Sequence, residues 1–154
     1  MKGFTLLEVL VAVFIAGVLA AIAAPSWLSF VESREMGTIA EKSLIALRTA
    51  QSQAIQSRLE RFIEFRENNG IEYSIYSKGA SPEVWENIGE AGFSAENDFT
   101  TISFDFQGNV NFPDYGDEFP TIAFSDPDNR YLTCVQVRTL LGGMSIERDD
   151  RCLP

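Results

Sequence analysis

A single carboxylate, Glu8, stands at the head of a long apolar run near the start of the chain. The sequence begins MKGFTLLEVLVAV, and residues 9–31 carry no charged side chain. A carboxylate in an apolar phase costs several kcal/mol unless a positive group pairs with it, so its presence there indicates a function. Glu8 therefore predicts an ion pair in an apolar environment, and its cationic partner has to be found.

The uncharged stretch is long enough to cross a bilayer as a helix. Its 23 residues, at about 1.5 Å each, span roughly 35 Å. Two ordinary alternatives are a plain membrane anchor and a secretory signal peptide, for which AIAAPS would be the cleavage site. Lys2 is the one basic side chain before the run, and Glu8 lies where a conventional signal peptide avoids negative charge. This placement disfavours the signal peptide.

The junction GFTLLEVLVAV resembles the processing site and first helical turns of type IV pilins and pseudopilins. The resemblance implies that a prepilin peptidase cuts after Gly3 and methylates the new amino group of Phe4. It assigns the assembly glutamate of that family to Glu8 and the helix-kinking proline to Pro25. The leader MKG is shorter than is usual in the family, which leaves open a start codon further upstream.

Cleavage would supply the cationic partner of Glu8. Removal of residues 1–3 exposes an ammonium group on Phe4, and the two charges stabilise one another when they pair in an apolar core. We expect the pair to join neighbouring subunits and to fix the axial stagger of their helices. In the alternative, Glu8 pairs with the terminus of its own chain or reaches toward the lipid headgroups.

Pro25 lies inside the predicted helix. It lacks an amide hydrogen and clashes with the carbonyl four residues back, and Gly17 weakens the same stretch. The helix should therefore bend or loosen over residues 21–25. The resemblance implies local unwinding there in filaments, whereas a passive kink of a membrane helix fits the sequence alone equally well.

The resemblance implies that residues 1–3 are a leader remnant, and periodicity divides the rest of the chain into three longer parts. Residues 4–31 are the hydrophobic transmembrane and assembly helix. Apolar residues recur at three- and four-residue spacing over 32–57, which predicts an amphipathic continuation of that helix. Over 58–154 the period changes to two, and turns at NNG, QGN, DPDN and LLGG separate seven or eight predicted antiparallel strands. The predicted fold class is α+β: a long N-terminal helix, membrane-spanning in its first half, packed on an antiparallel β-sheet or sandwich head.

Two cysteines, Cys134 and Cys152, lie near the end of the sequence. An even count in an exported chain favours one disulfide. The last predicted hairpin, YLTCVQVR-TLLGG-MSIER, turns near Leu141 and Gly142 and carries the tail back toward Cys134. A bond there would close a loop of under twenty residues and add about 3 kcal/mol of stability. Two free thiols are the alternative.

Composition excludes histidine-based catalysis and histidine–metal sites, because the chain contains no histidine. The serines lie in no G-x-S-x-G or S-x-x-K motif with a suitable base. We therefore expect no enzymatic activity and no cofactor. The turn DPDN offers oxygen ligands on Asp126, Asp128 and Asn129 that suit calcium. Surface turns also use Asp and Asn for local hydrogen bonds, so the absence of a metal is the stronger expectation.

The long helix followed only by strands, with FDFQGNVNF and YLTCVQVRTLLGGMSIE near the end, resembles the GspH/FimT group of minor pilins and pseudopilins. The resemblance implies a structural subunit, first a single-pass protein of the bacterial inner membrane. It is then assembled into a pilus or a type II secretion pseudopilus, with its head in the periplasm or outside the cell. Its partners would be other pilin or pseudopilin subunits, the prepilin peptidase and the inner-membrane assembly platform.

The alternative role is a DNA-binding or adhesive module at a pilus tip, for uptake or attachment. Some relatives in the FimT branch bind DNA through a C-terminal G-R-x-R motif. In the comparable stretch LGGMSIER, Gly143 and Ser145 stand where the arginines would be. Residues 72–128 carry twelve acidic side chains and one basic side chain, Lys78. Phosphate binding needs clustered lysine and arginine, so the sequence disfavours a nucleic-acid partner.

Overall fold

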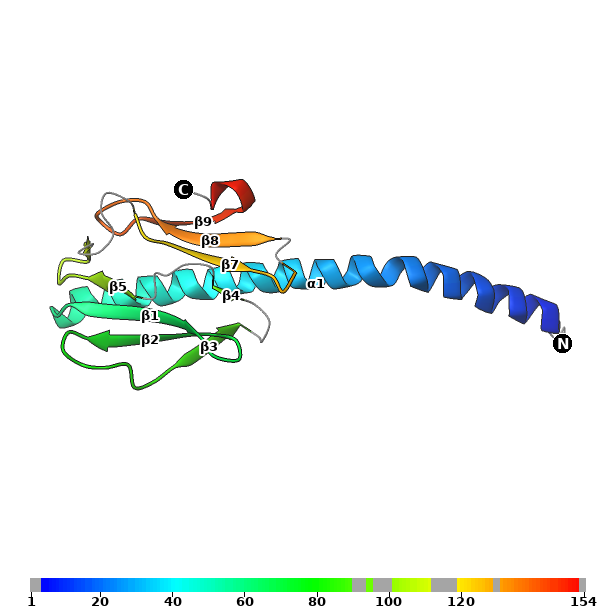
Figure 1. Cartoon of the computed structure of the whole chain (residues 1–154), viewed down its shortest axis with the longest axis horizontal. Helices are drawn as coiled ribbons and strands as arrows, with labels where there is room; N and C mark the ends of the chain where they lie inside the picture. The colour runs from blue at the N-terminus through cyan, green and yellow to red at the C-terminus, as the bar shows by residue number, and fades with distance from the viewer. Residues whose placement is uncertain (1–3, 90–93, 96–100, 112–118, 129–130, 153–154) are drawn as a thin grey trace. The chain divides into compact units, whose positions relative to one another are not determined.

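The computed structural model describes residues 4–89, 94–95, 101–111, 119–128 and 131–152. The chain divides into two compact units, Met1–Arg34 and Glu35–Pro154. The first unit holds the N-terminal part of helix α1. The second unit, the head, holds the rest of α1 and the described strands (Figure 1).

Helix α1 extends from Leu6 to Ser57. Its last residue is the one predicted, and the helix stops there because Arg58 takes a left-handed backbone conformation with a φ of 54°. The helical assignment is continuous across Gly17 and Pro25, so the loosening expected over residues 21–25 is not observed in the isolated chain. The unwinding that the resemblance implies for filaments stays a prediction.

The described strands form two antiparallel sheets in the head, which confirms the predicted α+β class. The first sheet has the order β3-β2-β1-β5-β6 and the second has the order β4-β7-β8-β9. The bounds in the first sheet are β1 Arg61–Glu67, β2 Ile71–Ser77, β3 Glu86–Gly89, β5 Thr101–Phe104 and β6 Val110–Asn111. Those in the second are β4 Ser94–Ala95, β7 Thr121–Ser125, β8 Leu132–Val137 and β9 Met144–Arg148, followed by a short 3-10 helix, Asp149–Arg151. The sequence patterns predicted all of these strands except β3 and β4.

The three predicted hairpins, β1–β2, β5–β6 and β8–β9, are all confirmed. In the first of them Ile63 pairs with Ile75 and Phe65 pairs with Tyr73. Asn69, with a φ of 52°, makes the tight turn between these two strands. The alternation of the pairs turns Ile63 and Phe65 toward the interior, where both are buried.

One hydrophobic core joins α1 to both sheets in the head. In Figure 1, β1–β3 lie along one side of the helix and β7–β9 along the other. The buried helix residues follow three- and four-residue spacing: Met36, Ile39, Ala40, Leu47, Ala50 and Ala54. They share a single cluster with Phe65 of the first sheet and Phe124 of the second. The amphipathic pattern predicted over 32–57 therefore fixes which face of the helix holds the sheets.

Cys134 and Cys152 form a disulfide with their Cα atoms 5.6 Å apart, as predicted. The register of the hairpin places Cys134 opposite Glu147 in β9, not opposite Cys152. The short 3-10 helix then turns the chain back over the sheet, which brings Cys152 to Cys134. Both cysteines are buried in a small cluster with Ala123. The bond therefore ties the tail of the chain to the second sheet.

Candidate assembly site at the start of the helix

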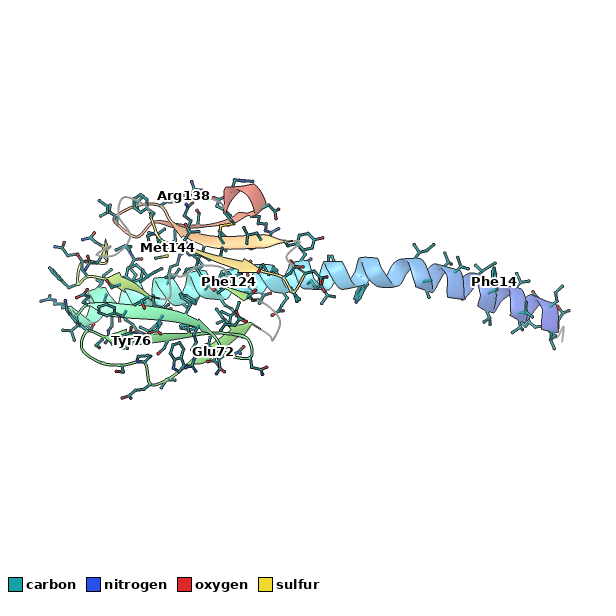
Figure 2. All side chains as sticks on the ribbon, viewed as in Figure 1. Phe14, Glu72, Tyr76, Phe124, Arg138 and Met144 are labelled. Atoms are coloured by element: carbon teal, nitrogen blue, oxygen red, sulfur yellow. A yellow bond between two sulfur atoms is a disulfide. The ribbon has the colours of Figure 1, made fainter. Side chains whose placement is uncertain are left out.

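The first half of α1 presents apolar side chains that nothing in the isolated chain covers. Phe14 projects from the helix with 70% of its surface exposed (Figure 2). The same holds along the segment for Phe4, Leu6, Leu7, Leu10, Val13, Leu19, Ile22 and Trp27. Transfer of such an apolar surface from water to a contact with lipid or with other chains is strongly favourable.

Among the described residues, no helix combines the length and the mean hydropathy of a membrane span.

Thr5 caps the start of this helix, and sequence reasoning missed it. The backbone N–H of Glu8 donates to Thr5 Oγ1 at 3.2 Å, and the N–H of Val9 donates to the carbonyl oxygen of Thr5 at 3.2 Å. Thr5 thus stands at the N-cap and Glu8 three positions later, the spacing of a capping box. The signal was present in the sequence, because a T-x-x-E stretch before an apolar run marks a helix start.

Of the predicted processing and assembly residues, Phe4 and Glu8 lie at this helix start, whereas Pro25 lies further along α1. Gly3, after which the cut is predicted, lies outside the described residues. Phe4 and Glu8 are both exposed, and the Glu8 carboxylate makes no ion pair with any described residue. A negative charge in the first turn is favoured by the helix dipole, which lowers the cost of placing Glu8 there.

The weak calcium candidates do not form a metal site among the described residues. Asp126 is fully buried, and its Oδ1 accepts the backbone N–H of Tyr131 at 2.8 Å, a local bond within the β7–β8 turn. Asn129 lies outside the described residues. In the part of the chain that is described, no three acidic or cysteine side chains are placed to hold a metal ion.

Two of the arginines near the tail, Arg138 and Arg151, pair with the same carboxylate, Glu147. Arg138 donates to Glu147 Oε1 at 2.6 Å and to the hydroxyl of Ser145 at 2.8 Å. Arg151 lies 3.3 Å from the other oxygen of the Glu147 carboxylate. Glu147 therefore neutralises part of the charge that a phosphate would need, and Ser145 occupies a place where the DNA-binding motif has arginine.

At the end of the head where α1 finishes, the side chain of Gln51 connects the helix to a turn of each sheet. Its Nε2 donates to the carbonyl oxygen of Gly108 at 2.8 Å and to that of Leu141 at 3.0 Å. The β5–β6 turn and the β8–β9 turn belong to different sheets, so Gln51 joins the two sheets to the helix. A backbone bond from Val110 to Leu140, at 3.0 Å, links the same two turns directly.

Asp105 organises the β5–β6 turn from within. Its Oδ1 accepts the backbone N–H groups of Gln107 and Asn109 at 2.8 and 2.9 Å, and its Oδ2 accepts the side-chain amide of Asn109. Burial acts to raise the pKa of Asp105, but the hydrogen bonds from Asn109, Gln107 and Gly108 outweigh it and hold the pKa below its ordinary value. Both oxygens of the Asp105 carboxylate therefore accept hydrogen bonds within the β5–β6 turn.

Two comparisons with known proteins bear on these features. The prokaryotic N-terminal methylation motif matches residues 1–24. A crystal structure of the type IV minor pilin FimU from Pseudomonas aeruginosa is similar, with a TM-score of 0.58 and 18% sequence identity over 80% of this chain and 99% of the FimU chain. FimU in a second crystal form gives a TM-score of 0.54 and 16% identity, over 76% of this chain and 99% of that one. At these identities the likeness establishes the fold. No curated protein sequence matches the chain.

Proposed function

We propose that this chain is a minor type IV pilin or pseudopilin, because the methylation motif of type IV pilins and the fold of a minor pilin occur together in it. Such a protein is a structural subunit and catalyses no reaction. One observation carries the proposal: the methylation motif stands at the start of a helix whose first half is apolar and exposed.

The processing steps follow from the residues at that start. Prepilin peptidase cuts after Gly3 and methylates the amine of Phe4. Before assembly, residues 4–31 hold the chain as a single span in the bacterial inner membrane, with the head in the periplasm. At the inner-membrane assembly platform, the apolar face then leaves the lipid and packs against the helices of other pilin subunits.

Glu8 pairs with the Phe4 ammonium of a neighbouring subunit in the assembled filament. An exposed Glu8 that makes no ion pair with a described residue supports this role, because its charge becomes costly only when neighbouring helices bury it. The Thr5 cap adds a second, local role for the same stretch, since it satisfies the backbone N–H of Glu8 at the start of the helix.

A pseudopilus of type II secretion is built from subunits with the same N-terminus and is the second form of this proposal. A DNA-binding module at the tip is disfavoured, because Glu147 already pairs with Arg138 and Arg151. The formal net charge of −10 also repels a polyanion.

The test is the mass and N-terminal sequence of the protein recovered from its own host. The proposal predicts a chain that begins at Phe4 with a methylated amine, and a Gly3→Leu variant that stays uncut in the membrane fraction. A mature chain that begins at Pro25 or later would indicate an ordinary signal peptide and overturn the proposal.

A further inference from the structure

The end of the head at which α1 finishes carries exposed apolar side chains from three separate segments. We name this surface the distal patch, and it consists of Ile55, Leu59, Phe106, Leu140 and Leu141. Three of the five stand in the turns between strands, where polar residues and glycine are usual. Leu141 is 77% exposed, and nothing in the turn requires a leucine there.

Close approaches and hydrogen bonds bring the segments that carry these side chains together. Gly108 of the β5–β6 turn lies so close to Ile55 that a Cβ on it would be 2.8 Å from the Ile55 Cδ1. Gln51 ties the Gly108 carbonyl to that of Leu141, which brings the β8–β9 turn to the same place. The patch is therefore held rigid by hydrogen bonds beneath it and needs little ordering to bind.

The register of the first sheet adds the remaining two side chains. Arg61 pairs with Phe104 at the end of β1 and β5. Leu59 precedes Arg61 by two residues, and Phe106 follows Phe104 by two residues in the β5–β6 turn. Phe104 is fully buried in the core with α1, whereas Phe106 lies two residues further on and is exposed.

Two exposed arginines, Arg48 and Arg58, border the patch. Arg48 lies two helical turns before Ile55 on the exposed face of α1, and Arg58 directly precedes Leu59. Neither forms an ion pair with any described residue. Two nearby carboxylates have other partners. Asp105 accepts hydrogen bonds within its own turn, and Glu60 forms an ion pair with Lys78 at 2.7 Å.

We propose that the distal patch binds the head of a different subunit of the same filament, through an apolar surface rimmed by carboxylates. This inference rests on the proposed function, since it names a partner of the assembled subunit. An apolar centre bordered by arginine is the composition of protein–protein interfaces. The guanidinium groups of Arg48 and Arg58, which form no ion pair with a described residue, favour an acidic rim on that partner.

The experiment places a photo-crosslinking phenylalanine derivative, p-benzoylphenylalanine, at Phe106 or Leu141 of the full chain in its host. Val84 is the matched control, because it is 79% exposed and apolar but lies outside the patch. Sheared filaments and membranes are irradiated separately, and adducts are identified by mass spectrometry. Both patch positions should link, in the filament fraction, to another protein that carries the N-terminal methylation motif. Arg58→Glu should lower that yield by about fivefold, as loss of one ion pair allows, whereas Arg58→Lys should preserve it.

Three results would overturn the inference: adducts no more abundant than at Val84, adducts only with a second copy of this chain, or adducts only with lipid. The intact mass of the same samples reports whether Phe4 is methylated and whether the chain is in the filaments. A processed and incorporated chain without the expected adduct refutes the distal patch alone. A chain absent from filaments refutes the proposed function and the inference together.

Discussion

The side-chain amide of Gln51 lies 2.8 Å from the carbonyl oxygen of Gly108, and the same nitrogen lies 3.0 Å from the carbonyl oxygen of Leu141. One helix residue thus satisfies a carbonyl from a turn of each sheet. These two hydrogen bonds join segments that are far apart in the chain, because Gly108 follows Gln51 by 57 positions and Leu141 follows it by 90. It explains how two separate sheets and one helix end in a single rigid surface.

Gln51→Ala should lower the free energy of unfolding of the head by about 1 kcal/mol, because the partly buried carbonyl of Gly108 and the exposed carbonyl of Leu141 lose their donor. The measurement is urea unfolding of a truncated chain that begins at Val31. Gln56→Ala is the control, since among the described residues the Gln56 amide bonds only to Ser52, on the exposed helix surface. Equal midpoints for the two variants would show that Gln51 does not join the sheets.

The disulfide gives a second stability prediction. Cys134 and Cys152 are 18 residues apart, and closing a loop of that size adds about 3 kcal/mol in the chain-entropy account. Replacement of both by serine should lower the unfolding free energy by that amount, and reduction of the wild-type chain should give the same result. Oxidised and reduced chains that unfold at the same urea concentration would contradict this.

Tyr73 gives a prediction for alkaline pH. Burial, and then the hydrogen bond donated to Glu86 at 2.6 Å, raise the pKa of Tyr73 from 10.0 to about 12. A raised pKa means that the folded state favours the protonated phenol, so this stabilisation is complete below pH 10 and is lost as the pH rises toward 12. The stability difference between wild type and Tyr73→Phe should therefore shrink over that range.

Glu86→Gln separates the two causes of that shift. It removes the charge and weakens the hydrogen bond but leaves the burial of Tyr73 in place. Phenolate absorbance should then show Tyr73 titrating at a lower pH than in the wild type, yet still above its ordinary pKa of 10.0. A titration unchanged by Glu86→Gln would show that the hydrogen bond has no part in it.

The sequence predicted the elements whose signals are local. Spacing of apolar residues gave the helix and the face that Leu47 and Ala54 bury, and the NNG turn gave the β1–β2 hairpin. Strand β3 was missed because PEVWENIG contains a proline and no clear alternation. Strand β4 was missed because Ser94–Ala95 is too short to show a period.

What the sequence did not predict depends on contacts between distant segments. The division into two sheets follows from which strands share an edge, and no single strand carries that information. The role of Gln51 exists only once two turns meet at the helix. At the candidate site, Glu8 was predicted from its chemistry. The Thr5 cap was not predicted, although its spacing to Glu8 is the local signal of a capping box.

The central claim, that Glu8 supplies a charge for a neighbouring Phe4 ammonium, is tested by comparing variants in assembled filaments. Glu8→Gln is decisive, because glutamine can serve in the same capping box but carries no charge. Thr5→Ala is its counterpart, since it removes the cap and keeps the charge. Both variants should still be inserted and cleaved, because the terminus is then at the membrane surface.

The measurement is the ratio of this chain in purified filaments to the chain in membranes, for each variant. An unpaired ammonium buried among apolar helices costs several kcal/mol, so Glu8→Gln should lower the ratio by about tenfold or more. Glu8→Asp, which keeps the charge on a shorter side chain, and Thr5→Ala should lower it less. Incorporation of Glu8→Gln at the wild-type ratio would show that charge is not what Glu8 supplies and would contradict the account.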